Sequence, residues 1–366
     1  MEKLKKIGII EGIALVTIFM INELLLNVPK VFFHSVGTAT PINIIYISII
    51  IIFICIFLYK LFKPFENMDI LDVSEALGGK FLKIVIGILF IGLFAIASAT
   101  TLRNFSEILK SIYLPKTPLL VLSISFLICS IILNKAGFKT ITLTNVLIVP
   151  IVLINILIMF AFAIPMFNPS NLLPILGNGI EPTFFSGLSN IYAFNGISIL
   201  FFLMPFFDKK EDFKKVNIIG IIISSLLLIL SITSLLLVFN LTIIKEESLS
   251  MYWLIRMIGF GRFFQRIDSM FILLWIMSAL SYLAVNLFLI IHIFKKLTKL
   301  NKIKIWEYLF SIIILLVSLI PQSLSDIIFT SRLVYKYYVL ILVFGLSFII
   351  LILANFRKKH IGEKYD

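Results

Sequence analysis

The sequence predicts an all-α, polytopic membrane protein with about ten transmembrane helices. Of its 366 residues, 60% are apolar and only 14% are charged, whereas soluble globular domains carry about 25% charged residues. The mean hydropathy is +1.12. Apolar runs near the length of about 20 residues that crosses the hydrocarbon core recur along the chain. Because backbone polar groups cannot stay unpaired in lipid, we expect these runs to be helices.

The apolar runs divide the chain into ten expected spans. These cover residues 7–28, 42–60, 82–105, 117–133, 141–165, 184–206, 217–240, 267–294, 306–321 and 333–354. The basic start of the chain resembles a signal peptide, but its apolar run continues past Leu26 without a small-residue cleavage site, so we expect a retained first span. We expect one membrane domain, 1–366, with five-helix repeats at 1–165 and 184–354 and a cytoplasmic tail at 355–366.

The distribution of lysine and arginine predicts the orientation in the membrane. If the N-terminus is cytoplasmic, 22 of the 32 basic residues lie on the inside segments and 10 on the outside segments. Cytoplasmic loops carry an excess of these residues, so both termini are expected inside the cell. The stretches 208–215 and 295–304 are the clearest inside loops, and 166–183 contains no lysine or arginine.

Charge and motif content argue against several other classes of protein. The net charge of +13 comes from basic residues between apolar runs, and no basic stripe with interleaved aromatics indicates nucleic-acid binding. Cys55 and Cys129 lie in apolar runs, and His34, His292 and His360 lack metal-ligand spacing. No nucleophile–base pair, phosphate-binding loop or cofactor signature appears, so we expect neither an enzyme nor a cofactor.

Two expected spans, the first and the sixth, contain polar residues and a helix breaker. The first has Asn22, Glu23, Asn27 and Pro29, and the sixth has Asn190, Asn195, Gly196 and Pro205. Interrupted helices at matching positions of two halves are typical of the substrate site of an inverted-repeat transporter. The alternative is a pair of kinked helices that only pack against neighbours.

Glu23 is an acidic residue within the apolar first span, and it is the single residue that most strongly suggests a binding site. A carboxylate deep in the bilayer costs about 2.5–3.5 kcal/mol on insertion scales, so it is normally turned toward a cavity or a partner. Glu23 would bind a cation, contact a substrate ammonium or take up a proton. A position near the outer interface, where a charge costs little, is the alternative.

The third span ends in a charged and hydroxyl-rich stretch. Arg103 precedes Glu107 by four residues, so a pair on one helix face is the simpler interpretation. The alternative directs Arg103 toward Glu23 or a substrate carboxylate. Ser98 and Thr101 either line a cavity or bond back to their own helix.

The sixth and eighth spans supply the remaining candidate ligand-binding residues. Asn195-Gly196 is the expected break of the sixth span, where freed backbone groups bind ions or zwitterions, with Tyr192 and Ser198 nearby. On the eighth span, Tyr282 either faces the cavity or packs between helices. Asp268 is expected to pair locally with Arg266. Residues 249–264 form either an interfacial helix or an ordinary loop.

Short motifs, in order along nearly the whole chain, resemble the B subunits of spore germinant receptors. These proteins are endospore germination permeases of the amino acid–polyamine–organocation superfamily. The motifs are Leu26-Asn27-Val28-Pro29, Leu77-Gly78-Gly79-Lys80, Leu102-Arg103-Asn104-Phe105, Leu114-Pro115-Lys116-Thr117-Pro118-Leu119, the stretch 171–177, Phe194-Asn195-Gly196, Leu203-Met204-Pro205-Phe206 and Arg266-Ile267-Asp268 with Trp275.

The resemblance implies a LeuT-type fold with broken first and sixth helices in the inner membrane of the spore. It also implies A and C partner subunits, and a small germinant, often an amino acid, bound between those helices. Two positions depart from the family pattern. Asn22-Glu23-Leu24 stands where a glycine-rich break is usual, and Ser198 where many members have an acidic residue. Glu23 is therefore a candidate to supply the charge lost at Ser198.

Two functions, a receptor subunit and a secondary transporter, agree with these features, and a cation channel is a third alternative. The first is a ligand-sensing receptor subunit, in which germinant binding shifts the two repeats and signals to partners. The second is a secondary transporter that moves an amino acid with a cation or proton. A cation channel would need a continuous polar path. Fold alone does not separate these functions.

Overall fold

The computed structural model describes residues 6–26, 28–247, 250–258, 267–300, 304–321 and 336–362. The side chains of 23–26, 28–29, 267–268, 270, 304 and 359–362 lie outside this description. Within the described ranges the chain forms helices and connecting loops, with no strand. Seven helical segments are long and apolar enough to cross a membrane, and three shorter apolar helices accompany them at the remaining expected spans. The all-α, ten-span fold class is thereby confirmed.

The first half of the chain contains the helices of the first five spans. They are α1 (Ile9–Leu26) with α2 (Val28–Val36), α3 (Thr40–Phe62), α4 (Ile70–Ile112), α5 (Leu119–Lys135) and α6 (Phe138–Ala163). The expected first span, 7–28, corresponds to α1, and α2 leads from it toward α3. Asn27 itself lies outside the described residues.

The second half contains the last five spans and two short helices between them. The sixth span consists of η4 (Glu181–Phe185), η5 (Ser186–Ile199), α7 (Leu200–Leu203) and η6 (Met204–Phe206). It is followed by α8 (Lys210–Val238), α9 (Leu241–Glu246), α10 (Ser250–Met257), α11 (Ile267–Thr298), α12 (Lys304–Ser318), α14 (Lys336–Val339), η8 (Leu340–Leu346) and α15 (Ser347–Gly362).

Several helices begin or end outside the limits expected from hydropathy. α4 starts at Ile70 rather than at 82, because Asp69 caps it in a reciprocal capping box with Asp72. Gly79, with φ +71°, then marks the kink that leads into the apolar part. α8 likewise begins at Lys210, and α15 continues to Gly362. Hydropathy finds the lipid-crossing part of a helix but not its polar extension.

The segment 249–264 contains the short helix α10, as the first of its two interpretations expected. Tyr252, Leu254 and Ile255 are buried, whereas Trp253 and Arg256 are exposed and lie within 5.3 Å of each other, from the guanidinium carbon to the ring centre. This separation of a buried and an exposed face is typical of an amphipathic helix. Residues 259–266 lie outside the described part of the chain.

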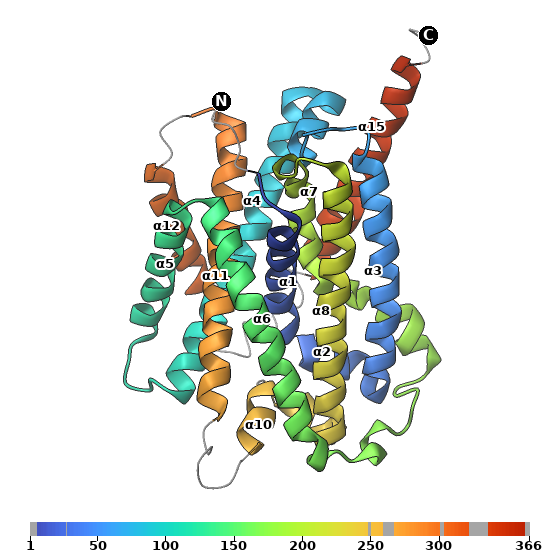
Figure 1. Cartoon of the computed structure of the whole chain (residues 1–366), viewed down its shortest axis with the longest axis vertical. Coiled ribbons are helices and arrows are strands. Elements are labelled where there is room, and N and C mark those ends of the chain that lie inside the picture. Colours follow the sequence, from blue (N-terminus) through green and yellow to red (C-terminus); the bar gives the residue numbers. More distant parts are fainter. Residues whose placement is uncertain are drawn as a thin grey trace.

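α1 occupies the middle of the bundle, between α8, α6 and α11 (Figure 1). α4 packs against α11, α12 and α15. α1 begins and α15 ends at the same end of the bundle, as an even number of crossings requires (Figure 1). At this end Lys358 donates to the Pro64 carbonyl and Arg357 to the Leu77 carbonyl, and we call it the basic end.

At the basic end, the start of α1 is fastened to the end of the sixth span. Lys6 Nζ donates to the carbonyl oxygens of Pro205, at 3.0 Å, and Phe207, at 2.9 Å, and the Ile7 amide donates to the Phe206 carbonyl. Lysine ammonium groups are well suited to the unpaired carbonyls at a helix C-terminus. α1 and η6 are therefore held together at this end.

A buried group of charges joins the α3–α4 loop to α11. Asp69 is fully buried, and Lys296 Nζ lies 2.6 Å from an oxygen of Asp69 and 2.6 Å from an oxygen of Asp72. His292 Nε2 lies 3.5 Å from Asp69 Oδ2, which is an ion-pair distance but too long for a well-formed hydrogen bond. Burial alone would raise the pKa of Asp69, but His292 and Lys296 outweigh it and hold that pKa well below its usual range.

This arrangement predicts a specific loss of stability in acid. Because the pKa of Asp69 is lower in the folded protein, its stabilisation is complete above the unfolded value, about 3.9, and is lost as the pH falls through the folded value. We expect Asp69→Asn to be less stable than the wild type at pH 6, and the difference to shrink below about pH 4. Thermal unfolding in detergent between those pH values measures it; a constant difference would contradict this account.

Candidate ligand-binding site

The first and sixth spans meet at Gly196. A Cβ atom added to Gly196 would lie 2.5 Å from Met20 Sδ and 3.1 Å from Met20 Cα. The second distance involves backbone, so even alanine would force α1 and η5 apart. Met20 is fully buried, and η5 is buried from Asn190 to Ile199. The two helices therefore cross in direct contact inside the protein, where glycine permits the approach.

The helix that crosses α1 is not a regular α-helix. η5 is a 3₁₀ helix of 14 residues with a non-helical residue, Phe194, at φ −83° and ψ +27°. Runs of 3₁₀ helix longer than three or four residues are uncommon, and a 3₁₀ stretch within a longer helix often marks a functional hinge. The interruption expected at Asn195-Gly196 thus lies at Phe194, one residue earlier. Asn195 and Gly196 follow it directly and are both buried.

Residues 19–22 of α1 contact three further helices at the level of this crossing. The Phe19 ring lies 4.7 Å from the Tyr282 ring of α11 and 6.4 Å from the Phe94 ring of α4, between ring centres. Tyr282 is fully buried. Asn22 Nδ2 donates to the Ser278 carbonyl at 3.0 Å, and the Ser278 hydroxyl shares its one proton between the Trp275 carbonyl, at 2.9 Å, and Asn22 Oδ1, at 3.3 Å. The structure therefore brings Asn22, Tyr282 and Gly196 around one short segment of α1.

The bond from the Ser278 hydroxyl to Asn22 predicts a coupling between these two side chains. The bond from Asn22 to the Ser278 carbonyl uses the backbone, so Ser278→Ala leaves it in place and a mutant cycle reports the hydroxyl bond alone. Hydrogen bonds between helices in membranes contribute about 0.6 kcal/mol on average and up to about 1.7 kcal/mol. We expect a double-mutant cycle of Asn22→Ala and Ser278→Ala to give a coupling near the average, measured by unfolding in detergent. Ser234, which bonds within α8, provides a control partner that should not couple to Asn22. Additive effects of the first pair would contradict the hydroxyl bond.

The three candidate hydroxyls lie in different surroundings. Ser98 is buried on α4 and donates to the Phe94 carbonyl of its own helix at 2.7 Å, and Thr101 on the same helix is 6% exposed. Ser198 is fully buried on η5, and none of the described residues offers its hydroxyl a hydrogen bond. Buried polar groups normally have partners, so Ser198, four residues after Phe194, is notable for a hydroxyl that no other described residue binds.

Arg103 follows the simpler of its two interpretations. Its Nη2 and Nε donate to Glu107 Oε1, at 2.8 and 3.0 Å, and its Nη1 donates to the Ser318 carbonyl at the end of α12. The expected pair along one helix face is confirmed. Arg103 thus joins α4 to α12, and a direct contact with ligand stays a prediction. Glu23, Asn27 and Asp268 have side chains outside the described part of the chain, so their predicted roles stay predictions too.

Tyr192 has a charged neighbour that sequence analysis did not select. The ring is 6% exposed, and Lys336 Nζ at the start of α14 lies 5.9 Å from its centre. The same ammonium donates to Ser189 Oγ at 2.8 Å. Lys336 and Met20 were missed because Lys336 looks like an ordinary lysine at the end of a span, 333–354, and Met20 like an ordinary core residue. Only the fold brings them to η5.

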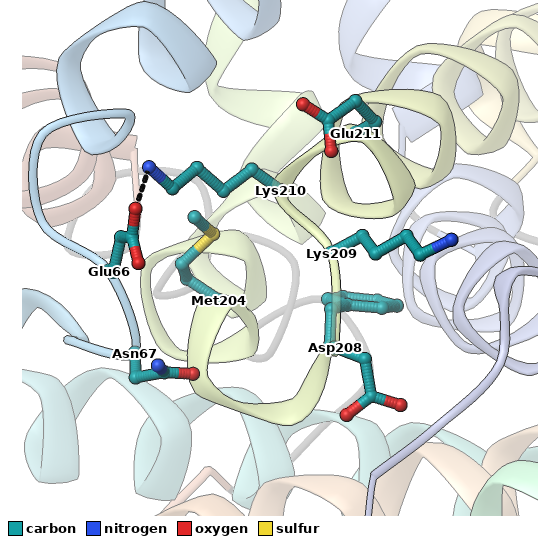
Figure 2. Close-up of a pocket in the computed structure, with 8 residues that line it drawn as sticks. Glu66, Asn67, Met204, Asp208, Lys209, Lys210 and Glu211 are labelled. Carbon is teal, nitrogen blue, oxygen red and sulfur yellow. Dashed lines mark ion pairs between the residues drawn. The ribbon is translucent and has the colours of Figure 1, made fainter.

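The described residues line hollows at two places of interest. A narrow crevice between α1, α6 and α11 is lined in part by Ile21, Trp275 and Ser278. It lies beside the hydrogen bonds that join Asn22 to Ser278. The other, of about 320 Å³, lies at the basic end, where an ion pair from Lys210 to Glu66 spans it while Lys209 extends the opposite way (Figure 2). Its lining is Glu66, Asn67, Met204, Phe207, Asp208, Lys209, Lys210 and Glu211.

A ten-span helical bundle whose first span meets an interrupted sixth span at a buried, partly polar crossing defines a transporter-type membrane protein. Comparison with solved structures agrees. The chain superposes on a Na⁺-coupled sialic acid symporter, in a substrate-bound outward-open state, with a TM-score of 0.67 over 93% of this chain and 80% of that one, at 14% identity. A manganese transporter from Eremococcus coleocola gives 0.57 over 95% and 76%, at 13% identity. The fold is thus that of the LeuT-type transporters.

Sequence comparison identifies the family. The model of the spore permease family, described as spore germination protein, matches residues 6–327, and the chain therefore belongs to this family. Among its relatives in Bacillus subtilis (strain 168), spore germination protein A2 is 24% identical over 97% of both chains. Spore germination protein KB is 27% identical over 62% of this chain and 60% of that protein. The family is a permease family rather than an enzyme family.

Proposed function

We propose that this chain is the nutrient-sensing B subunit of a spore germinant receptor. It binds a small germinant, such as an amino acid, between α1 and η5 and triggers germination together with A and C subunits. The observation that carries the proposal is the buried crossing of α1 and the interrupted η5 at Met20 and Gly196. Membership in the spore germination family supplies the biological context.

The contacts of η5 suggest how binding would reach partner subunits. Asn190 Nδ2 donates to Ser35 Oγ of α2 and to Asn43 Oδ1 of α3, so one side of the break is fastened to the first repeat. Beyond the break, η6 is fastened to the start of α1 through Lys6. A ligand at the crossing favours whichever arrangement of these two attachments it fits better. Partner subunits that contact the moving ends would then respond.

The proposal includes a location and an orientation. The chain is a multi-pass membrane protein, and we place it in the inner membrane of the spore with both termini in the cytoplasm. The 22-to-10 distribution of basic residues supports this orientation, because the loops at the basic end would then face the cytoplasm. Its apolar surface contacts the lipid bilayer. We propose no nucleic-acid partner.

The second candidate function is a secondary symporter that moves an amino acid with a cation or proton. The similarity of fold to a Na⁺-coupled symporter favours it. A transporter moves its substrate without partner subunits, whereas a receptor subunit needs only to bind it.

Uptake and germination measured side by side separate the two functions. We expect spores lacking this gene to lose the response to one nutrient, and proteoliposomes of the purified chain to bind that nutrient without accumulating it. Accumulation by the chain alone, driven by a cation or proton gradient, would establish the symporter instead. Unchanged germination of the deletion strain on every single nutrient would overturn the receptor proposal.

A further inference from the structure

Lys336 lies at the start of α14, beside η5 and inside the tenth expected span. The hydroxyl of Tyr338, two residues further along, donates to the Leu89 carbonyl of α4. Leu89 lies seven residues inside the expected third span, 82–105. Lys336 is therefore next to the apolar part of α4 rather than in a loop at the surface.

The ammonium of Lys336 is directed at η5. A lysine in a membrane-spanning segment usually extends its charge toward the polar layer. Lys336 is instead half-buried, donating to Ser189 at 2.8 Å and lying over the face of Tyr192. Tyr192 is one helical turn from Asn195 and Gly196, so the positive charge borders the interrupted part of η5.

The elements around Lys336 are those that surround the crossing. α14 packs against η5. Two residues after Lys336, the Tyr338 hydroxyl donates to the Leu89 carbonyl of α4 at 2.6 Å. Lys336 is therefore held where α14, η5 and α4 come together, beside the interrupted helix of the candidate site.

The chemistry of the group indicates what it would recognise. An ammonium has three N–H donors, so it can bond the Ser189 hydroxyl and the oxygens of an anion at the same time. Charge-assisted hydrogen bonds to carboxylates are roughly twice as strong as neutral ones, and they are stronger still in a half-buried, low-dielectric setting.

We propose that Lys336, held by Ser189 and Tyr192, recognises a carboxylate on the ligand that binds at the crossing of α1 and η5. Lys336 is then the specificity-determining residue that separates amino acids from their uncharged carboxamides. The inference rests on the proposed function, because it takes the crossing as the ligand site.

The test compares ligands that differ only in this charge. Wild type, Lys336→Gln and Lys336→Arg are purified in detergent and titrated with single L-amino acids, each beside its carboxamide, by equilibrium binding. We expect the wild type to prefer the acid and Lys336→Gln to lose about 10- to 100-fold of that preference. Lys336→Arg should retain most of it. A role confined to tethering α14 to η5 would weaken acid and amide alike and leave their ratio unchanged.

A matched control lies elsewhere in the chain. Lys135 on α5 has the same type of partner, since it donates to the Tyr308 hydroxyl at 2.5 Å and lies 4.8 Å from that ring centre. Lys135→Gln should leave the acid-to-amide ratio unchanged. Equal binding of acids and amides by the wild type would overturn the role of Lys336 but leave the proposed function standing. Absence of binding by every acid and amide of the panel would overturn both.

Discussion

Replacing Gly196 with alanine is expected to weaken the nutrient response about 5- to 150-fold. The added methyl group would lie 2.5 Å from Met20 Sδ and 3.1 Å from Met20 Cα. The thioether can move, but the backbone of α1 cannot do so without separating the two helices. Overpacking of this kind costs about 1–3 kcal/mol. If the ligand needs α1 and η5 in their native contact, that free energy appears as lost affinity. The readout is the nutrient concentration that half-maximally triggers germination.

A second glycine on a different helix separates the site from general packing. A Cβ at Gly220 of α8 would lie 2.8 Å from Val16 Cγ1 and 3.0 Å from Val16 Cβ, so it overpacks α1 as well, but away from the break. Gly220→Ala should lower thermal stability with little change in nutrient sensitivity. Gly8, with nothing within 4 Å of its Cβ position, should tolerate alanine. Equal loss of sensitivity in Gly196→Ala and Gly220→Ala would show that packing alone accounts for the effect.

Replacing Lys296 with methionine is expected to destabilise the fold by about 3–5 kcal/mol, because it leaves two carboxylates, one of them fully buried, without their shared cation. Lys296 Nζ is 2.6 Å from both Asp69 and Asp72, and Asp69 has no solvent-exposed surface. The measurement is the free energy of unfolding in detergent at neutral pH. A triple variant that also carries Asp69→Asn and Asp72→Asn should recover much of the loss, because no unpaired charge remains.

A less buried ion pair provides the control for Lys296. Lys139 lies 2.6 Å from Glu11, and their side chains are 36% and 14% exposed, against 21% for Lys296 and 0% for Asp69, so solvent screens this pair more. Lys139→Met should cost no more than about 1 kcal/mol. Equal losses of stability in Lys139→Met and Lys296→Met would show that the burial of Asp69 does not strengthen its pairing with Lys296. The proposed role of this pair in joining the α3–α4 loop to α11 would then be wrong.

The transmembrane part of the fold was predictable because lipid imposes a single rule on it. Each span needs a long apolar run, and such runs can be counted directly in the sequence. The polar extensions were not predictable in this way. Residues 70–77 at the start of α4 follow the capping box of Asp69, whereas the polar first turn of α8, with Glu211 and Asp212, has no side-chain cap. Mean hydropathy reports neither of these polar starts.

The candidate site was only partly predictable. Interrupted spans reveal themselves by asparagine, glycine and proline in apolar surroundings, so Asn22, Asn195 and Gly196 stood out. Met20 is an ordinary apolar residue whose importance comes from its closeness to Gly196 across 176 positions of sequence. Lys336 likewise lies far along the chain from Ser189 and Tyr192. Contacts of this kind depend on how helices far apart in the sequence pack together, which a single sequence does not record.

The location of the ligand is the central claim, and photolabelling tests it most directly. A diazirine-bearing amino acid is irradiated with the full-length protein in membranes, with and without an excess of its unmodified parent, and the adducts are mapped by mass spectrometry. We expect adducts that the parent suppresses on α1 near Phe19 to Asn22 and on η5 near Tyr192 to Ser198. Suppressible adducts confined to other places, such as the hollow lined by Glu66 and Asp208 at the basic end, would contradict the account.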